Sequence, residues 1–318
     1  MNPVALEVVR GGLVESVHTA RVVVTDPDGR VRLALGAVDA PMYPRSAAKP
    51  MQAIGMLEAG LDLDGELLAL AAASHSGEDF HLAGVRRILA EAGIPEDGLD
   101  CTADLPLDEQ ARAEWLRAGR GAEPVAMNCS GKHAAMLRTS VRNGWPTSGY
   151  RDPGHPVQRA VAAAIARLTG DRLPPATVDG CGAPLYAISL AGLARAFGRI
   201  AAAGSGPERL VADAFRNHPA YASGSRRDEA ALHGAVPGIV TKAGAEAVQA
   251  AGLPDGTGIA LKIEDGTPRG RAALMASVLR WLGYAHPVLV EQLTVPVLGH
   301  GRPVGEIRVR AGFFESQD

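Results

Sequence analysis

Ser46 and Lys49 form the first pair in the sequence whose types and spacing could carry out chemistry. On a helical turn, residues at i and i+3 lie on one face. A serine becomes a strong nucleophile only when a base removes its proton, and a neutral, partly desolvated lysine can do so. Alternatively, Ser46 only caps a helix and Lys49 extends into solvent. Because Ser-x-x-Lys alone is a weak motif, both interpretations stay open at this point.

The turn that begins at Ser74 is a second candidate for chemistry. Its sequence, Ser-His-Ser-Gly-Glu, places two hydroxyls and the imidazole of His75 between an apolar stretch and the polar start of a helix. Capping by Ser74 or Ser76 explains such a turn without any catalytic role. The concentration of these side chains at one turn is nonetheless unusual, so the segment remains a candidate.

Two cysteines, Cys129 and Cys181, lie in polar, glycine-containing segments. Core packing explains such thiols poorly, whereas turns can bring a soft cation three ligands and leave one position open. A third ligand could be His133 or, less commonly, Lys132, which would have to bind as the neutral amine. Two separate buried thiols are the alternative. A phosphate-binding loop is excluded because Ala126 stands where the first glycine of that motif belongs.

Lysines on two expected C-terminal strands could add positive charge to a site. Lys242 is followed by Ala243 and Gly244. An ammonium there can face a substrate carboxylate or a second serine, and the glycine lets substrate approach the backbone. Lys262, at the end of the next expected strand, is a competing candidate. Taken alone, either residue is most simply an exposed strand lysine.

The secondary structure that must position these residues is predicted to change from strands to helices and back to strands along the chain. A β-branched run, a Pro-Asp-Gly turn and an alternating run over 21–35 predict a hairpin. Strands at both ends around a helical middle, about 46–200, predict an α+β fold in which the terminal segments share one sheet. We expect residues 1–318 to form a single unit, because no repeat or low-complexity linker interrupts them. Helices are expected over 46–57, 65–73, 82–92, 133–142, 156–169, 185–197 and 271–282, and further strands over 240–242 and 258–263.

Composition narrows the class of protein. The 318 residues carry 32 Lys and Arg against 35 Asp and Glu, a net charge of -3, which excludes nucleic-acid binding by bulk positive charge. Three cysteines are too few for a disulfide framework and favour a reducing compartment. No signal-peptide pattern is present at the start, and no apolar run approaches the roughly 20 residues that span a bilayer. We therefore expect a cytoplasmic protein without membrane segments.

Taken together, the candidate motifs follow one another in a recognisable order. They are RSAAKPMQ at 45–52, SHSGE at 74–78, NCSGKH at 128–133, DGCG at 179–182 and KIEDG at 262–266. In this order they resemble the thermolabile, Rhizobium-type L-asparaginases. The similarity runs over about residues 8–283, which makes it far more specific than any single motif.

The resemblance implies an amidohydrolase that converts L-asparagine to L-aspartate and ammonia. Its α+β fold would be similar to serine β-lactamases and glutaminases, with an antiparallel sheet from both chain ends packed with helices. Two Ser-Lys pairs are implied: Ser46 with Lys49, and Ser74 with a lysine of the C-terminal strands. We expect that lysine to be Lys242, because Lys-x-Gly followed by a further strand and a long helix resembles β-lactamase-like sites. Lys262 is the alternative.

The resemblance also implies a zinc ion held by Cys129, Lys132 and Cys181, and a homodimer. The zinc would aid substrate binding and is not necessarily required for turnover. The residues expected to bind substrate or support the nucleophile are Arg45, His75, Asp179 and Gly180.

In the expected mechanism, neutral Lys49 takes the proton of Ser46, whose Oγ attacks the side-chain amide. Ammonia then leaves with a proton relayed through Ser74 and the second lysine, and water hydrolyses the β-aspartyl ester. Three alternatives remain open. One is a glutaminase, and another is a penicillin-binding or esterase-type hydrolase, which would not need the two cysteines. The third is a module that binds an amino acid or zinc without turnover.

Overall fold

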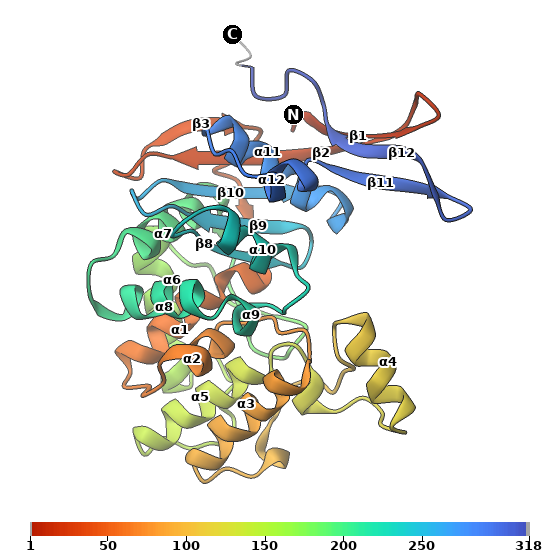
Figure 1. Ribbon diagram of the computed structural model, residues 1–318. Helices are drawn as coiled ribbons and strands as arrows, with labels where there is room; N and C mark the ends of the chain where they lie inside the picture. The colour runs from red at the N-terminus through yellow and green to blue at the C-terminus, as the bar shows by residue number, and fades with distance from the viewer. Residues whose placement is uncertain (1, 316–318) are drawn as a thin grey trace.

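The computed structural model describes residues 2–315 and consists of an antiparallel sheet stacked on a layer of helices (Figure 1). Within these residues the main sheet has eight strands in the order β11-β12-β1-β2-β10-β9-β8, and β3 pairs with β2 beside this path. Its strands are β1 (Val4–Arg10), β2 (Leu13–Thr25), β3 (Val31–Leu35), β8 (Val240–Gly244), β9 (Val248–Gly252), β10 (Gly258–Ile263), β11 (Thr294–Gly299) and β12 (Arg302–Val309).

The long strand β2 joins the two halves of this sheet. Its first part, up to Thr19, pairs with β1, and its second part, from Ala20, pairs with β10. Because β1 also pairs with β12, strands from both ends of the chain form one antiparallel sheet. This confirms the predicted α+β class and the shared sheet, and the pairing of β2 with β3 confirms the predicted hairpin.

Alternating side chains of the sheet enter two different cores, as the period of two in a strand requires. Val22 and Val24 of β2 belong to a cluster that includes Leu274 and Val278 of helix α11. Val23, between them, belongs to a larger cluster shared with the helical layer. Helix α7 covers this second face, where it packs on β2, β9 and β10. The sheet is therefore a rigid support for residues at its strand ends.

The helical part of the chain extends further than the sequence suggested. It continues to Ala235, beyond the expected end near residue 200. The helix expected over 185–197 begins later, at Leu190, where the Ser189 hydroxyl caps it by accepting from the Gly192 N–H. The helices are α1 (Lys49–Glu58), α2 (Gly65–Ala71), α3 (Asp79–Glu91), α4 (Glu109–Arg117), α5 (Ser130–Arg142), α6 (Pro156–Thr169), α7 (Leu190–Ala202), α8 (Gly206–Asn217), α9 (Pro219–Ala222), α10 (Asp228–Ala235), α11 (Arg271–Trp281) and α12 (Pro287–Gln292).

Two small ladders and four 3-10 helices complete the described structure. Two-residue strands form the ladders β4 (Pro41–Met42) with β7 (Ile188–Ser189) and β5 (Thr177–Val178) with β6 (Pro184–Leu185). The 3-10 helices cover Arg45–Ala48, Glu96–Gly98, Pro124–Ala126 and Pro268–Gly270. No helix among residues 2–315 is both long and apolar enough to cross a membrane.

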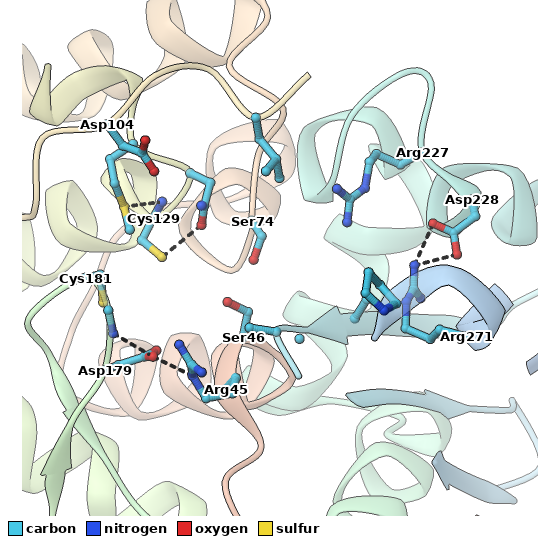
Figure 2. A pocket seen from close by; sticks show the side chains of 18 of the residues that line it. Arg45, Ser46, Ser74, Asp104, Cys129, Asp179, Cys181, Arg227, Asp228 and Arg271 are labelled. Atoms are coloured by element: carbon cyan, nitrogen blue, oxygen red, sulfur yellow. Dashed lines mark hydrogen bonds and ion pairs between the residues drawn. The ribbon is translucent and has the colours of Figure 1, made fainter. Parts of the chain in front are cut away.

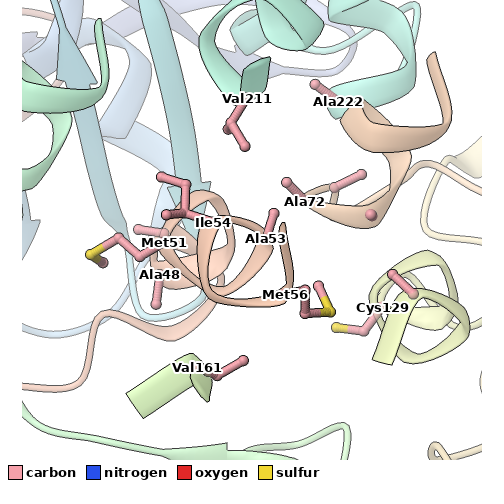
Figure 3. Packing of buried hydrophobic residues seen from close by; sticks show 14 of the residues in the cluster. Ala48, Met51, Ala53, Ile54, Met56, Ala72, Cys129, Val161, Val211 and Ala222 are labelled. Atoms are coloured by element: carbon pink, nitrogen blue, oxygen red, sulfur yellow. The ribbon is translucent and has the colours of Figure 1, made fainter. Parts of the chain in front are cut away.

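Helix α1 lies at the centre of the helical layer, which fixes the position of its first residue, Lys49. All residues from 49 to 56 are buried. Figure 3 shows Val161 of α6 on one side of α1 and Val211 of α8 on another, with Met51 and Ile54 in the packed interior. Because closely packed side chains permit little movement, the position of Lys49 is restricted by the core around it.

Candidate active site

Ser46 lies in the short 3-10 helix Arg45–Ala48, which leads directly into α1. Arg45 has a φ of 49°, in the left-handed region that residues other than glycine seldom adopt, so the chain turns sharply just before the serine. The end of β8 packs against this turn. A Cβ on Gly244 would lie 2.6 Å from the carbonyl oxygen of Pro44 and 3.2 Å from the backbone nitrogen of Ser46. Glycine therefore lets β8 approach the serine turn closely.

Lys49, at the start of α1, links the Ser46 segment, which precedes it in the chain, to Ser74 through a hydrogen bond. It is only 1% exposed, and its Nζ donates to the Ser74 Oγ at 3.0 Å and to the Ala73 carbonyl oxygen at 2.5 Å. Among the described residues its hydroxyl partner is thus Ser74 rather than Ser46, which the resemblance had paired with it. A single buried lysine therefore holds the second serine close to the segment that carries the first.

Lys242 lies on β8 and is fully buried against an acid that the sequence analysis did not select. Its Nζ donates to Glu229 Oε1 at 3.1 Å. The same oxygen accepts from the Ala243 N–H at 2.8 Å, and Oε2 accepts from Arg227 Nη2 at 2.8 Å. Burial lowers the pKa of Lys242 to about 8; the Glu229 carboxylate opposes this shift and the ammonium of Lys49 adds to it. Lys242 thus titrates near neutral pH.

The Glu229 carboxylate stays charged in this buried position. Burial alone would raise its pKa, but the charges of Lys242, Arg227 and Arg271 outweigh that effect and hold the pKa well below its usual range. The predicted contact between Lys242 and Ser74 is not among the hydrogen bonds of residues 2–315, in which Lys242 binds Glu229 instead.

A cavity of about 600 Å³ opens beside the two serines. Figure 2 shows Ser46 and Ser74 near its middle, between two groups of polar side chains on opposite sides. We call these groups the sulfur end (Arg45, Cys129, Asp179 and Cys181) and the arginine end (Arg227, Asp228 and Arg271).

The sulfur end includes Arg45 and Asp179, two of the four residues expected to bind substrate, and a third, Gly180, lies next to Asp179 in the chain. Arg45 Nε donates to Asp179 Oδ1 at 2.7 Å, and the Gly180 N–H donates to the same oxygen at 2.8 Å. The Thr102 hydroxyl holds this turn by donating to the Gly180 carbonyl oxygen at 2.9 Å. Arg45, Asp179 and Gly180 all line the cavity. Their contact with substrate remains a prediction.

The two thiols of the sulfur end are in contact with each other and with Lys132. A hydrogen bond with Cys129 and the positive charge of Lys132 lower the pKa of Cys181, whereas the pKa of Cys129 is raised by that same hydrogen bond and by burial. Lys132 Nζ lies 3.1 Å from Cys181 Sγ. Burial alone would lower the pKa of Lys132. The charges of Cys181 and Cys129 outweigh this effect, so the pKa of Lys132 is raised. The positive charge of Lys132 therefore favours the thiolate form of Cys181.

The donor atoms of this cluster fit a zinc ion only if Lys132 is one of the ligands. Among residues 2–315, no group of three or more His, Cys, Asp or Glu side chains is placed to hold a metal ion, so His133 does not complete a site with the two thiols. Cys129, Lys132 and Cys181 do converge, and two thiolates with a neutral amine are soft donors that suit zinc. The cluster therefore fits the group that the resemblance implies.

Five of the expected site residues do not line the cavity: Lys49, Lys132 and Lys242, which are buried, and His75 and Lys262. His75 is fully buried, its Nε2 is hydrogen-bonded to Ser130 Oγ at 2.8 Å, and burial lowers its pKa well below the usual value. It joins the Ser74 turn to the start of α5 and is not a lining residue. Lys262 Nζ donates to the carbonyl oxygens of Glu246 and Ile263, at 3.0 and 3.2 Å, also away from the lining.

The arginine end was missed by the sequence analysis. Arg271 Nη2 donates to both carboxylate oxygens of Asp228, at 3.0 and 2.9 Å, and its Nη1 donates to Gln249 Oε1 at 2.5 Å. The one available signal was the charged run Arg226–Glu229 between a Ser-Gly-Ser turn and a helical stretch. Such a run is usually a solvated helix start, so its role depends on the tertiary structure.

Comparisons with known proteins identify the class and the family. The sequence model of the L-asparaginase II family matches residues 6–309, so the chain belongs to this family. It is therefore a hydrolase of the amidohydrolase type that acts on a small molecule. A search of curated protein sequences finds no match.

Three proteins are among the solved structures with a similar chain path. A β-lactamase from Mycobacterium bovis is 16% identical with a TM-score of 0.45, over 82% of this chain and 94% of that one. EstCE1, a hydrolase with promiscuous acyltransferase activity, is 12% identical with a TM-score of 0.39, over 79% and 90%. Mglu, in its tris and glutamate form, is 16% identical with a TM-score of 0.38, over 88% and 63%.

Proposed function

We propose that this protein is an L-asparaginase that hydrolyses L-asparagine to L-aspartate and ammonia through an acyl-enzyme on Ser46. One observation carries the proposal: two serines from distant segments share one cavity, and a buried lysine beneath them is hydrogen-bonded to one of them. Membership of the L-asparaginase II family supports the choice of substrate.

The geometry supports a proton relay between the two serines. In the first step Ser46 Oγ attacks the side-chain amide carbon, and its proton passes to neutral Lys49. Lys49 can return a proton through the Ser74 hydroxyl, which it already contacts, to the nitrogen that leaves as ammonia. Water then splits the ester between Ser46 and the β-aspartyl group, which restores both side chains.

Lys242 and Glu229 would set the charge around this relay. The ammonium of Lys242 would add positive charge close to Lys49. Glu229 keeps Lys242 in place through the 3.1 Å contact. Catalytic function is thus proposed for Ser46, Lys49, Ser74 and Lys242.

Cys129, Lys132 and Cys181 are the residues that would hold a zinc ion. When bound, the ion would supply positive charge that orients polar groups of the substrate at the sulfur end. The substrate-binding role of Arg45, Asp179 and Gly180 is proposed for the same end, since all three line the cavity there. We also propose that the enzyme acts as a homodimer in the cytoplasm, as the family resemblance implies.

The test is ammonia release by purified protein given L-asparagine or L-glutamine, with and without a chelator. Release from asparagine supports the proposal, and a chelator-dependent rise in KM would locate zinc at substrate binding. Glutamine is the second candidate substrate, because a cavity of about 600 Å³ has room for one additional methylene. No release from either amide would overturn the proposed reaction.

A further inference from the structure

The cavity is much larger than the substrate proposed for it. Volumes of about 300–1,000 Å³ are typical of pockets that enclose drug-sized ligands. The 600 Å³ here falls within that range, whereas L-asparagine has only nine non-hydrogen atoms. If the amino-acid part of the substrate lies at the sulfur end and the scissile amide lies at the serines, the arginine end is left without an occupant.

The arginine end carries an excess of positive charge. Arg271 is matched by Asp228, to which it donates twice. Glu229, in contrast, is shared between Lys242 and Arg227. Arg227, Arg271 and the buried Lys242 are thus balanced by only two carboxylates, whereas the further lining cation Arg226 is paired with Asp108. An anionic group in this part of the cavity would balance the remaining charge.

The Nη1 group of Arg227 is a hydrogen-bond donor that could bind such an anion. Its Nε and Nη2 both donate to Glu229 Oε2, at 3.2 and 2.8 Å, which fixes the guanidinium. Within residues 2–315 its Nη1 has no hydrogen-bond partner, and the side chain is 28% exposed where it lines the cavity. Figure 2 shows Arg227 on the side of the serines opposite Cys181. A planar guanidinium held on one side is well suited to bind a carboxylate with its other nitrogen.

We propose that the arginine end is a subsite for the leaving group, and that it binds the carboxylate of a small amino acid joined through its amine to the β-carbonyl of aspartate. The substrate class is therefore β-aspartyl conjugates of small amino acids, in addition to the simple amide. This inference rests on the proposed function, since it uses the same nucleophile and the same acyl-enzyme.

Hydrolysis of such a conjugate would follow the same steps as hydrolysis of asparagine. Ser46 Oγ bonds to the β-carbonyl carbon, the C–N bond breaks, and the amine of the departing amino acid takes a proton through Ser74. Water then hydrolyses the ester and releases aspartate. No oxidant, reductant or further reactant is needed, and only the leaving group differs from ammonia.

The test compares β-aspartyl-glycine with β-aspartyl-glycinamide, which has nearly the same size but lacks the carboxylate of the leaving glycine. Aspartate release gives kcat/KM for each, and L-asparagine is assayed in parallel. We expect the carboxylate to be preferred by about 10- to 100-fold, the effect of one hydrogen bond to a charged group in a partly enclosed site. In Arg227→Gln the ratio of the two kcat/KM values should fall to about one.

The ratio of the two kcat/KM values reports on the carboxylate of the leaving group, because both conjugates use the same catalytic groups. If a substitution at Arg227 disturbs Lys242 or Glu229, both kcat/KM values change equally and their ratio does not. Arg227→Lys is a second variant: it keeps a cation beside Glu229 but loses the free Nη1, and the ratio should fall there as well. Arg226→Gln is the matched control, since its guanidinium is already bound to Asp108; there the preference should persist.

Three results would overturn the subsite. One is hydrolysis of asparagine without hydrolysis of either conjugate, and another is equal hydrolysis of both conjugates by the unmodified protein. The third is a preference that survives in both Arg227 variants. Failure with asparagine as well would instead show that the proposed function itself is wrong.

Discussion

The two ends of the cavity differ in how their charged groups are held. At the sulfur end, Cys181 comes from a short turn, Cys129 and Lys132 come from the start of α5, and Cys181 contacts both of them. At the arginine end, each arginine is bound to a carboxylate: Arg271 to Asp228 of a distant segment, and Arg227 to Glu229 two residues further along the chain. The first arrangement converges on a point and suits a small cation, whereas the second leaves one guanidinium nitrogen directed at a larger ligand. The two serines lie between them.

Loss of the nucleophile between the two ends should have the largest effect. For Ser46→Ala we expect kcat/KM for asparagine to fall by at least about 10³-fold, because nothing remains to form the acyl-enzyme. Zinc content and thermal unfolding should be unchanged, since neither end is altered. Ammonia release gives the rate, and a variant that kept its turnover would remove Ser46 from the mechanism.

Removal of the second serine should be the next largest effect. Ser74→Ala removes the hydroxyl that Lys49 contacts and should lower kcat by about 10²-fold, the usual contribution of a positioned proton donor. Ser76→Ala is the matched control, because this buried hydroxyl donates to the Ser223 carbonyl oxygen and does not line the cavity. Equal losses in the two variants would mean that the turn has only a structural role.

Disruption of the sulfur end should affect binding more than chemistry. Cys181→Ser should lower the zinc content and raise KM for asparagine by about tenfold, with a smaller change in kcat. Cys101→Ser serves as its control, because that buried thiol contacts the Pro124 carbonyl oxygen outside the cavity lining. Metal analysis and steady-state kinetics provide both readouts. Unchanged zinc content in Cys181→Ser would exclude this cysteine as a ligand.

A change at Glu229 should appear in the pH profile. The Glu229 carboxylate favours the ammonium of Lys242, whose pKa is about 8, so Glu229→Gln should lower that pKa further. Because the proposed function uses the ammonium of Lys242, kcat/KM should fall as the pH rises through about 8 in the unmodified protein, and this basic limb should move to lower pH in the variant. A limb that stayed in place would show that Lys242 does not control the profile.

The smallest effect is expected for the second candidate lysine. Lys262→Ala should change kcat/KM by less than about twofold, as expected of a surface residue away from the site. Its Nζ contacts only two carbonyl oxygens at the sheet, whereas Lys242→Ala removes a buried group beneath the cavity. A large loss in Lys262→Ala combined with a small one in Lys242→Ala would reverse the assignment of the second lysine.

The sequence predicted elements well where the pattern is local. The hairpin over 21–35, the helix over 156–169 and the strand over 258–263 depend on periodicity and turn residues within a few positions. Helix α6 begins at Pro156 and is followed by Gly170 with a φ of 76°, which are ordinary start and stop signals. The late start of α7 was missed because a short strand precedes it.

The sequence by itself determined the chemical types present and their order: serines, lysines and cysteines in turns that match one family. It also predicted strands in the first forty residues and in the last third of the chain, although β11 and β12 were not among them. Only the tertiary structure decided which groups meet, because hydrogen bonds such as Lys49 with Ser74 and Lys242 with Glu229 join different elements. Local periodicity contains no information about such contacts. The arginine end depends on the packing of α10, β9 and α11, so its charge balance appears only when the chain is folded.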